Sequence, residues 1–369
     1  MLRREGIIKN FSPAWFAAVM GTGGLANVVY IWGKSWIPAY NLGVILAWLT
    51  AALFVIFLIP WILRWILYYD EVKKDLYHPL LRNFFATMPI AIMVVATNVN
   101  LMGKSFFSAE FILKFLLIVW IVGILGAFLI GVWATFIMMK EENTSPQMMN
   151  FAWFIPPVGN IIIPLVGSPL VAMLYQKGIA WANTAWLINL TFYGVGFFLF
   201  IFVGSVIFNR LVRHALSPAG MTPSFWILLG PVGVGVLSLM GIADTGKMLG
   251  FIVNPDILYI FAFILWGFGF WAFVQVLVLT IDYVKQGSIP FSLSWWAFVF
   301  PLAVYTMSAL KVGHYFNSGL VHGYAGLLTL LLFFFWVISF AKTLKGIGDG
   351  SLFIPHTAPS EGLKQSNSN

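Results

Sequence analysis

Long apolar stretches separated by short polar segments fill this chain. Ten stretches can be counted, and each is near or above the ~20 residues that a helix needs to cross a bilayer. The pattern predicts ten transmembrane helices, and the absence of a period-two alternation disfavours a transmembrane β-barrel. The stretches are 12–32, 41–69, 84–102, 109–139, 151–175, 183–208, 223–243, 256–281, 294–312 and 318–341.

Prolines gather in the odd-numbered stretches, whereas the even-numbered stretches have one interior proline, Pro60. A proline inside a helix removes a backbone donor and kinks the helix. At membrane depth such helices survive where they are buried in protein or face water. We therefore expect an all-α polytopic membrane protein of five helical hairpins, in which proline-kinked odd-numbered helices surround a central pore. The odd-stretch prolines are Pro13, Pro89, Pro156, Pro157, Pro164, Pro169, Pro231 and Pro301.

Composition agrees with a membrane protein and argues against an enzyme. The chain is 61% hydrophobic and 9% charged, whereas soluble domains carry about 25% charged residues. It has no cysteine, which excludes disulfides, thiolate metal sites and cysteine nucleophiles. Its five histidines show no metal-ligand spacing, and no acid–base pair lies within a stretch. We predict no catalytic residue, no metal and no cofactor. A receptor or scaffold would need a sizeable soluble module, which these short loops do not provide.

The distribution of positive charge predicts the orientation in the membrane. If the N-terminus is cytoplasmic, fourteen of the twenty lysines and arginines fall on the cytoplasmic side. The positive-inside rule then places both termini in the cytoplasm, and we expect the cell (plasma) membrane. We read the net charge of +8 as membrane topology, so nucleic-acid binding is not predicted. The expected organisation is a cytoplasmic N-terminus 1–11, a transport domain 12–342 and a mobile cytoplasmic tail 343–369.

Polar side chains at membrane depth are few. Ionisable residues fall toward the stretch ends, although coupled transporters often carry one near the midplane. Thr22, Asn98 and Asn160 lie on odd-numbered stretches, where lining a pore and bonding between helices are about equally expected. Asn189 and Gln275 lie on even-numbered stretches, where we expect interhelical hydrogen bonds.

One lysine lies near the end of each odd-numbered stretch. If these helices surround one axis, the five lysines form a basic ring at the outer mouth, which would concentrate anions. His314 and His322 would add charge there as external pH falls. The alternative is that each lysine reaches the lipid headgroups without a role in permeation. The five are Lys34, Lys104, Lys177, Lys247 and Lys311.

Two tryptophan-containing motifs resemble a known family. Phe11-Ser12-Pro13-Ala14-Trp15-Phe16, followed by Met20-Gly21-Thr22-Gly23, resembles the first helix of the tellurite-resistance/dicarboxylate transporter family. Trp295-Trp296-Ala297-Phe298-Val299-Phe300-Pro301 is similar to its ninth helix, and Pro156-Pro157 and Gly230-Pro231 fit the same pattern. The family includes malic-acid permeases, sulfite efflux pumps, tellurite-resistance proteins and slow anion channels. The resemblance covers roughly 10–342 and implies odd-numbered helices around a pore, and a homo-oligomer, by resemblance a trimer.

The resemblance also implies a function. It suggests transport of small anions across the bilayer, in our prediction C4-dicarboxylates such as malate. The alternatives are a passive channel for chloride or nitrate and an exporter of sulfite or tellurite. By resemblance, Phe300 plugs the pore as a gate; otherwise it is one packing aromatic among 36 phenylalanines.

With no central charge, a permeating anion must be stabilised by weaker groups. Backbone amides freed at kinks, helix dipoles, and side-chain amides or hydroxyls can serve. The alternative is that the prolines only shape helix packing. The residues that we assign to this path are Gly21, Thr22, Gly23, Pro89, Asn98, Pro157, Asn160, Pro164, Pro231 and Pro301.

Overall fold

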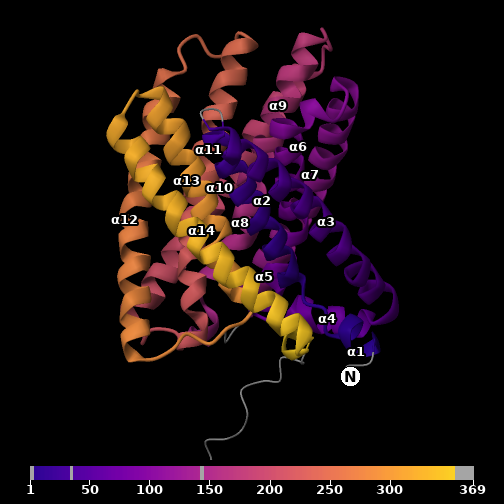
Figure 1. The fold of residues 1–369 in the computed structure, drawn as a ribbon, viewed down its shortest axis with the longest axis vertical. Helices are drawn as coiled ribbons and strands as arrows, with labels where there is room; N and C mark the ends of the chain where they lie inside the picture. Colours follow the sequence, from indigo (N-terminus) through magenta and orange to yellow (C-terminus); the bar gives the residue numbers. More distant parts are fainter. Residues whose placement is uncertain (1–3, 34–35, 142–144, 354–369) are drawn as a thin grey trace, which may run out of the picture.

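The computed structural model describes residues 4–33, 36–141 and 145–353, and these residues form helices and short connections without a β-strand (Figure 1). Ten helical spans are long and apolar enough to cross a membrane, as predicted. Lys34 of the predicted basic ring and residues 354–369 of the predicted tail lie outside the described residues.

The even-numbered spans are single long helices, and the odd-numbered spans are composite. The single helices are α3 (Ile37–Leu67), α7 (Ala109–Lys140), α10 (Ala182–Arg213), α12 (Asp256–Gln286) and α14 (Gly319–Gly348). The composite spans are η1 (Pro13–Trp15) with α2 (Phe16–Trp32); α5 (Leu81–Phe84) with α6 (Thr87–Met102) and η2 (Gly103–Ser105); η4 (Phe151–Phe154) with α8 (Ile155–Ile161) and α9 (Ile163–Gln176); η5 (Ala219–Leu228) with α11 (Leu229–Met248); and η6 (Leu293–Phe298) with α13 (Phe300–Tyr315). Short helices outside the spans are α1 (Arg4–Lys9), α4 (Tyr69–Tyr77), η3 (Pro146–Met148) and η7 (Ser351–Phe353).

The odd-numbered spans form an inner ring, and the even-numbered helices surround it. In the most apolar part of each odd-numbered span 67–89% of the residues are buried, against 22–39% in the even-numbered helices. The ring closes on itself, because α2 contacts α6, α6 contacts α9, α9 contacts α11, α11 contacts α13, and α13 returns to α2. Each outer helix packs on the inner helix of its own hairpin and on a neighbouring one. The predicted five hairpins with inner odd-numbered helices are therefore confirmed.

Most prolines of the odd-numbered spans do not kink a helix in its interior, contrary to our prediction. Among the described residues, only Pro60 and Pro169 lie in the interior of an α-helix. Most of the other odd-span prolines stand in the first turn, where the backbone N–H has no intrahelical partner and a proline costs no hydrogen bond. The odd-numbered spans consequently break at junctions between a short helical piece and an α-helix. The first-turn prolines are Pro13, Pro89, Pro156, Pro157, Pro164, Pro231 and Pro301.

Four of the five odd-numbered spans begin with a 3₁₀ piece, whereas the third begins with α5. Three of the 3₁₀ pieces are capped by a side chain: Ser12 Oγ accepts from the Ala14 N–H at 3.2 Å, and Asn150 and Ser292 cap η4 and η6 in the same way. Each 3₁₀ piece at the start of a span also carries a buried tryptophan, which anchors the start of the inner helix in the core. These are Trp15, Trp153, Trp226 and Trp296.

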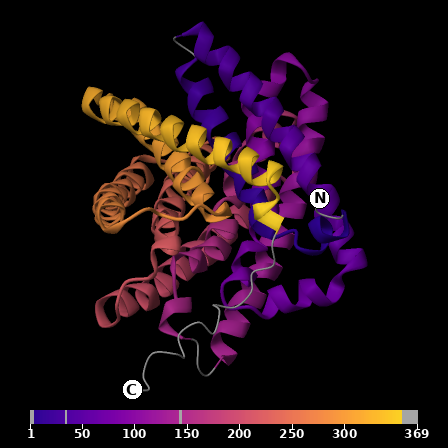
Figure 2. The same cartoon turned by 60° about the horizontal axis from the view of Figure 1, so that its bottom comes forward.

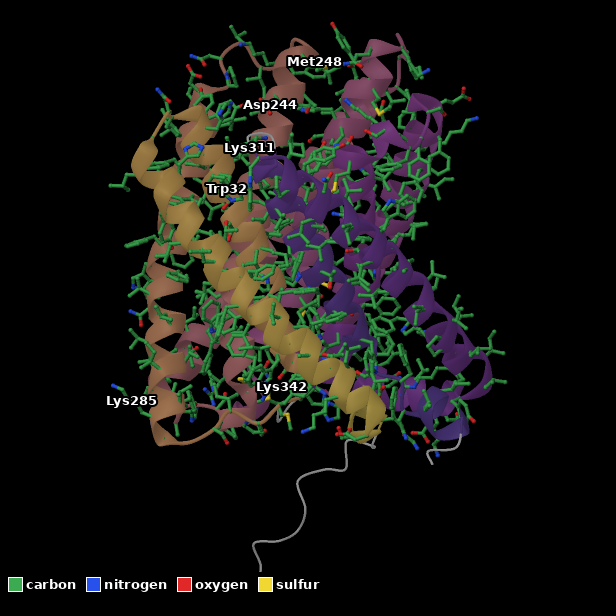
Figure 3. The ribbon with its side chains drawn as sticks, in the orientation of Figure 1. Trp32, Asp244, Met248, Lys285, Lys311 and Lys342 are labelled. Carbon is green, nitrogen blue, oxygen red and sulfur yellow. The ribbon has the colours of Figure 1, made fainter. Side chains whose placement is uncertain are left out.

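The two ends of the bundle differ in charge. Lys285 and Lys342 lie at one end, which we call the basic end, and Lys311 and Asp244 lie at the opposite end (Figure 3). The first and last described segments meet at the basic end, where Asn10 Nδ2 donates to the Phe353 carbonyl oxygen at 3.0 Å (Figure 2). α14 runs to Gly348, beyond the domain boundary predicted at 342, and Gly350, with a φ of +76°, turns the chain back in the left-handed conformation that glycine tolerates.

Candidate functional site

A narrow cavity of about 50 Å³ lies inside the inner ring, toward the basic end. All five inner spans contribute to its wall. The lining includes Met20 of α2, Thr87 of α6, Val158 of α8, Ile227 of η5 and Phe300 of α13. No lysine, arginine or histidine is among the described residues that line it. The cavity is therefore common to the whole ring and carries no fixed charge.

The cavity lies where the inner α-helices begin. Its wall includes the first residue of α6, α8 and α13 and the second residue of α2 and α11. A helix dipole places about half a positive elementary charge at the N-terminus. Several helix starts therefore surround one uncharged space, and the first N–H groups of α2, α8 and α11 donate to the 3₁₀ pieces that precede them.

Three hydroxyl side chains also line the cavity. The Thr87 hydroxyl donates to the Pro13 carbonyl oxygen at 2.7 Å, and the Ser224 hydroxyl donates to the Met221 carbonyl oxygen at 2.7 Å. Ser294 Oγ lies 2.7 Å from Ser292 Oγ. Since the Thr87 and Ser224 hydroxyls already donate within the protein, each would have to rotate to donate to a ligand.

Phe300 lies on the cavity wall and is only 4% exposed. Pro301, which follows it in the first turn of α13, lines the same cavity. α13 approaches α2 closely here: a Cβ on Gly24 would lie 2.7 Å from Ala303 Cβ and 3.7 Å from Phe300 Cδ2. Of the residues predicted for the gate and the anion path, Phe300 and Pro301 therefore line the cavity.

The predicted path residues of the first span point to neighbouring helices. Thr22 Oγ1 accepts from Trp336 Nε1 of α14 at 3.1 Å. A Cβ on Gly21 would meet the ring of Trp296 at 2.8 Å, and one on Gly23 would meet Val94 of α6. None of the three lines the cavity. Their small size instead lets the helices approach one another.

The asparagines at membrane depth bond between helices. Asn98 Nδ2 donates to the Gly23 carbonyl oxygen at 3.0 Å and to Asn27 Oδ1 at 2.7 Å. Asn160 Nδ2 donates to the Ala127 carbonyl oxygen at 3.4 Å, and Asn189 Oδ1 accepts from Trp120 Nε1 at 2.8 Å. Gln275, by contrast, is exposed on α12. Each of the three asparagines thus makes an interhelical bond, although the shorter bond of Asn160, at 3.1 Å, goes to the Pro156 carbonyl oxygen of its own helix, and no interhelical bond is seen for Gln275 in the described part of the chain.

The remaining predicted prolines are buried but do not line the cavity. Pro89 packs against Gly126 of α7, because a Cβ added to Gly126 would lie 3.0 Å from Pro89 Cβ. The Pro157 carbonyl oxygen packs against Gly196 of α10. Pro164 and Pro231 stand in the first turns of α9 and α11. A role for these residues in an anion path beyond the cavity stays a prediction.

The lysines of the predicted basic ring do not all keep a free charge. Lys104, Lys177 and Lys247 are exposed. Lys311 Nζ, however, lies 3.3 Å from Asp244 Oδ2 in an ion pair at the opposite end (Figure 3). Asp244 thus offsets the charge of Lys311, and the ring itself stays a prediction.

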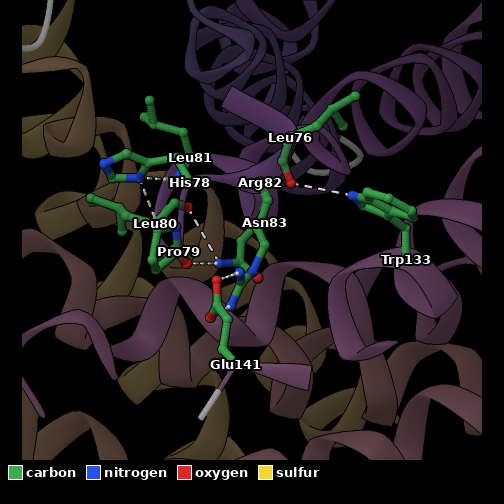
Figure 4. Close-up of polar contacts among 9 residues, drawn as sticks. All are labelled: Leu76, His78, Pro79, Leu80, Leu81, Arg82, Asn83, Trp133 and Glu141. Carbon is green, nitrogen blue, oxygen red and sulfur yellow. Dashed lines mark hydrogen bonds and ion pairs between the residues drawn. The ribbon is translucent and has the colours of Figure 1, made fainter. Parts of the chain in front are cut away.

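At the basic end, an ion pair fixes the segment that leads into the cavity wall. The Arg82 guanidinium forms a two-pronged pair with the Glu141 carboxylate, at 2.6 Å and 2.9 Å (Figure 4). Just before it, His78 Nδ1 accepts from the backbone N–H groups of Leu80 and Leu81, each at 3.2 Å. The ion pair therefore fixes the backbone at Arg82, two residues before Phe84, which lines the cavity.

Sequence reasoning missed most of the cavity wall, including Thr87, Ser224 and Ser294. A signal was nevertheless present in the third, seventh and ninth spans: their wall residues lie within about two turns of Pro89, Pro231 and Pro301. A proline favours the first turn of a helix, and here the first turns face the cavity.

The chain is similar in sequence to known membrane transport proteins. A family model described as voltage-dependent anion channel matches residues 10–344. The chain is 38% identical to an uncharacterized transporter of Methanocaldococcus jannaschii, over 95% of this chain and 97% of that protein. It is 27% identical to a sulfite efflux pump of Arthroderma benhamiae, over 91% of each chain, and 20% identical to a malic acid transport protein of Schizosaccharomyces pombe, over 90% of this chain and 77% of that protein.

Proposed function

Because the chain belongs to the voltage-dependent anion channel family, we propose that it carries small anions across the membrane through the central cavity of the inner ring. The observation that carries this proposal is the convergence of helix starts from all five inner spans on one uncharged cavity. Such a site attracts anions without holding them tightly, which suits passage more than storage.

The size and charge of the cavity bear on the substrate. One similar protein is described as a sulfite efflux pump and another as a malic acid transport protein. Malate is a dianion with two carboxylates, so moving it out of water removes two charges from their hydration, whereas a monoanion loses the hydration of one. The cavity offers partial helix charges, no fixed cation and about 50 Å³ of space. We therefore place a small monovalent anion, such as chloride, nitrate or hydrogen sulfite, ahead of the dicarboxylate predicted from the resemblance.

Phe300 is our proposed gate. It stands on the cavity wall at the first residue of α13, where α13 approaches α2 closely. A bulky apolar side chain in a narrow passage blocks hydrated ions, because the ion cannot keep its water there. Rotation of the Phe300 side chain would open the passage without moving a helix.

We further propose that the basic end faces the cytoplasm in the cell membrane, since fourteen of the twenty lysines and arginines are assigned to it. The exposed lysines at the opposite end would then raise the local concentration of anions at the outer mouth. We also propose that the protein forms a homo-oligomer, which by resemblance is a trimer.

The function can be tested by flux measurements on the purified protein in proteoliposomes. Chloride, nitrate, sulfite and malate would be compared at equal ionic strength, with and without a pH gradient. The proposal predicts flux of the monovalent anions above that of malate at neutral pH. Flux of malate alone would restore the dicarboxylate prediction, and absence of flux for all four anions from folded protein would contradict the proposal.

A further inference from the structure

The five inner spans together contain a single acidic residue, Asp244 of α11. It lies at the end of the molecule opposite the basic end, beside Lys311 of α13 (Figure 3). Lys311 Nζ is 3.3 Å from Asp244 Oδ2, so the carboxylate pairs with a lysine of the neighbouring inner helix. Because a negative charge repels anions, this carboxylate is unexpected in a ring that we propose carries them.

Both residues lie on the helix faces that line the central cavity further along the ring. Positions eleven residues apart share one face of an α-helix, because eleven residues make about three turns. Lys311 stands eleven residues after Phe300, and Gly241 stands eleven residues after Gly230; Phe300 and Gly230 both line the cavity. Asp244 follows Gly241 by about one turn. The pair therefore lies on the cavity side of α11 and α13, roughly 16 Å from the cavity wall along the helices.

Solvent reaches the inner ring from this end as far as the pair. All residues of α11 in 229–240 are buried, and the first exposed residue is Asp244, with 51% of its side chain exposed. All residues of α13 in 300–310 are buried, and Lys311 follows them with 37% of its side chain exposed. An anion that enters from this end would therefore meet Asp244 and Lys311 before the buried part of the ring.

The Asp244 carboxylate is also held from a third helix. The Tyr259 hydroxyl of α12 donates to Asp244 Oδ1, whereas Lys311 donates to Oδ2. Tyr259 itself is only 5% exposed, and its ring stacks on that of Tyr315 with centroids 3.9 Å apart. Each carboxylate oxygen thus has its own partner, which keeps the carboxylate beside Lys311.

The ion pair is not needed to hold α11 and α13 together. A Cβ on Gly233 of α11 would lie 2.5 Å from the backbone nitrogen of Tyr305 of α13, so the two backbones are already in contact. Ion pairs as exposed as that of Asp244 and Lys311 contribute little to stability, because water and salt screen them. The charges can therefore be changed without dismantling the ring.

We propose that Asp244 is a specificity-determining residue, which limits the entry of anions by occupying Lys311. This inference rests on the proposed anion path through the inner ring. While the carboxylate is bound, the pair has no net charge, and a small anion must compete with the carboxylate for the Lys311 ammonium. A negative charge at the entrance also lowers the local concentration of anions.

Flux into proteoliposomes tests the inference, with the whole protein and equal amounts of folded variants. The probe is whichever of chloride, nitrate, sulfite and malate the parent carries fastest, at a concentration well below saturation. Asp244→Asn removes the negative charge and keeps the shape, so we expect flux to rise about two-fold at ~0.1 M ionic strength, where the Debye length is ~10 Å. Lys311→Met leaves the carboxylate without its cation, so we expect flux to fall about two-fold. Both effects should fade at ~1 M, where the Debye length is ~3 Å.

A double variant separates the effect of charge from that of packing. Asp244→Asn combined with Lys311→Met restores a pair without net charge, so its flux should return close to that of the parent. A purely structural contact would instead lower flux in both single variants and in the double variant. Glu110→Gln is the matched control, because Glu110 also pairs with a lysine, Lys114, at 2.7 Å, but at the start of the outer helix α7. The control should leave flux unchanged.

Several results would overturn the inference. They are equal flux for the parent and both single variants at ~0.1 M ionic strength, lower flux in Asp244→Asn, a double variant no closer to the parent than the single variants, and an equal rise in Glu110→Gln. If one single variant fails to fold, the other decides the matter by the sign of its own effect. Each of these results leaves the proposed function standing, because the parent still carries the anion. Absence of flux from the folded parent would overturn both the function and the inference.

Discussion

At the scale of single residues, the face that a side chain occupies on its helix decides its role. Thr22 and Phe300 both belong to motifs that resemble the family pattern, yet Thr22 bonds to α14 while Phe300 reaches the cavity. Their residue types alone do not reveal this difference. It depends on the rotation of each helix about its axis, which packing against four or more neighbours determines.

The gate proposal leads to a test at Phe300. Replacing it with alanine removes a bulky apolar side chain from the cavity wall, so we expect anion conductance to rise by at least about two-fold. Phe298→Ala is the matched control, because Phe298 is equally buried but its ring stacks on Phe335, with centroids 4.8 Å apart. The control should lower stability, by about 3–5 kcal/mol, without raising conductance per folded molecule. Unchanged conductance in folded Phe300→Ala protein would remove the gate.

At the scale of helices, the apolar pattern predicted the ten spans, and the alternation of proline-bearing stretches predicted their division into inner and outer sets. It did not predict how the inner spans are broken. From the sequence, Pro156 and Pro301 were predicted to kink a continuous helix. In the structure they stand at the start of α-helices that follow 3₁₀ pieces. The hydrogen bonds that choose between these structures involve caps such as Ser12 and Asn150, whose signal is short and easily overlooked.

Close packing between inner and outer helices leads to a second test. Gly167 of α9 lies against Asn189 of α10, so that an added Cβ would overlap Asn189 Oδ1. Gly167→Ala should therefore destabilise the protein by about 1–3 kcal/mol in denaturant unfolding. Gly194→Ala is the control, since nothing lies within 4 Å of its added Cβ, and it should be neutral or slightly stabilising.

A double variant checks that the cause is local. Asn189→Ala clears the overlap but also removes the bond to Trp120. We therefore expect Gly167→Ala to cost less stability when added to Asn189→Ala than when added to the parent protein. Equal losses for the Gly167 and Gly194 variants would show that helix spacing at Gly167 is not what limits stability.

At the scale of the whole molecule, the account depends on the closed ring. Five inner spans, each shielded from lipid by an outer helix, bring their helix starts to one cavity. This convergence joins residues as distant in the chain as Met20 and Phe300, and a single sequence without its relatives does not specify which residues meet there. The alternation of proline-bearing and plain stretches nevertheless predicted that a ring would form.

The most direct test of the central claim is thiol blockade of anion flux. The chain has no cysteine, so a cysteine introduced at one position is the only thiol. Ser294→Cys and Ala17→Cys place that thiol on the cavity wall, and Thr22→Cys places it on α2 facing α14. We predict that a small charged thiol reagent abolishes flux in the two cavity variants and leaves flux in Thr22→Cys intact. Full flux after complete labelling at Ser294→Cys and Ala17→Cys would contradict a path through the cavity.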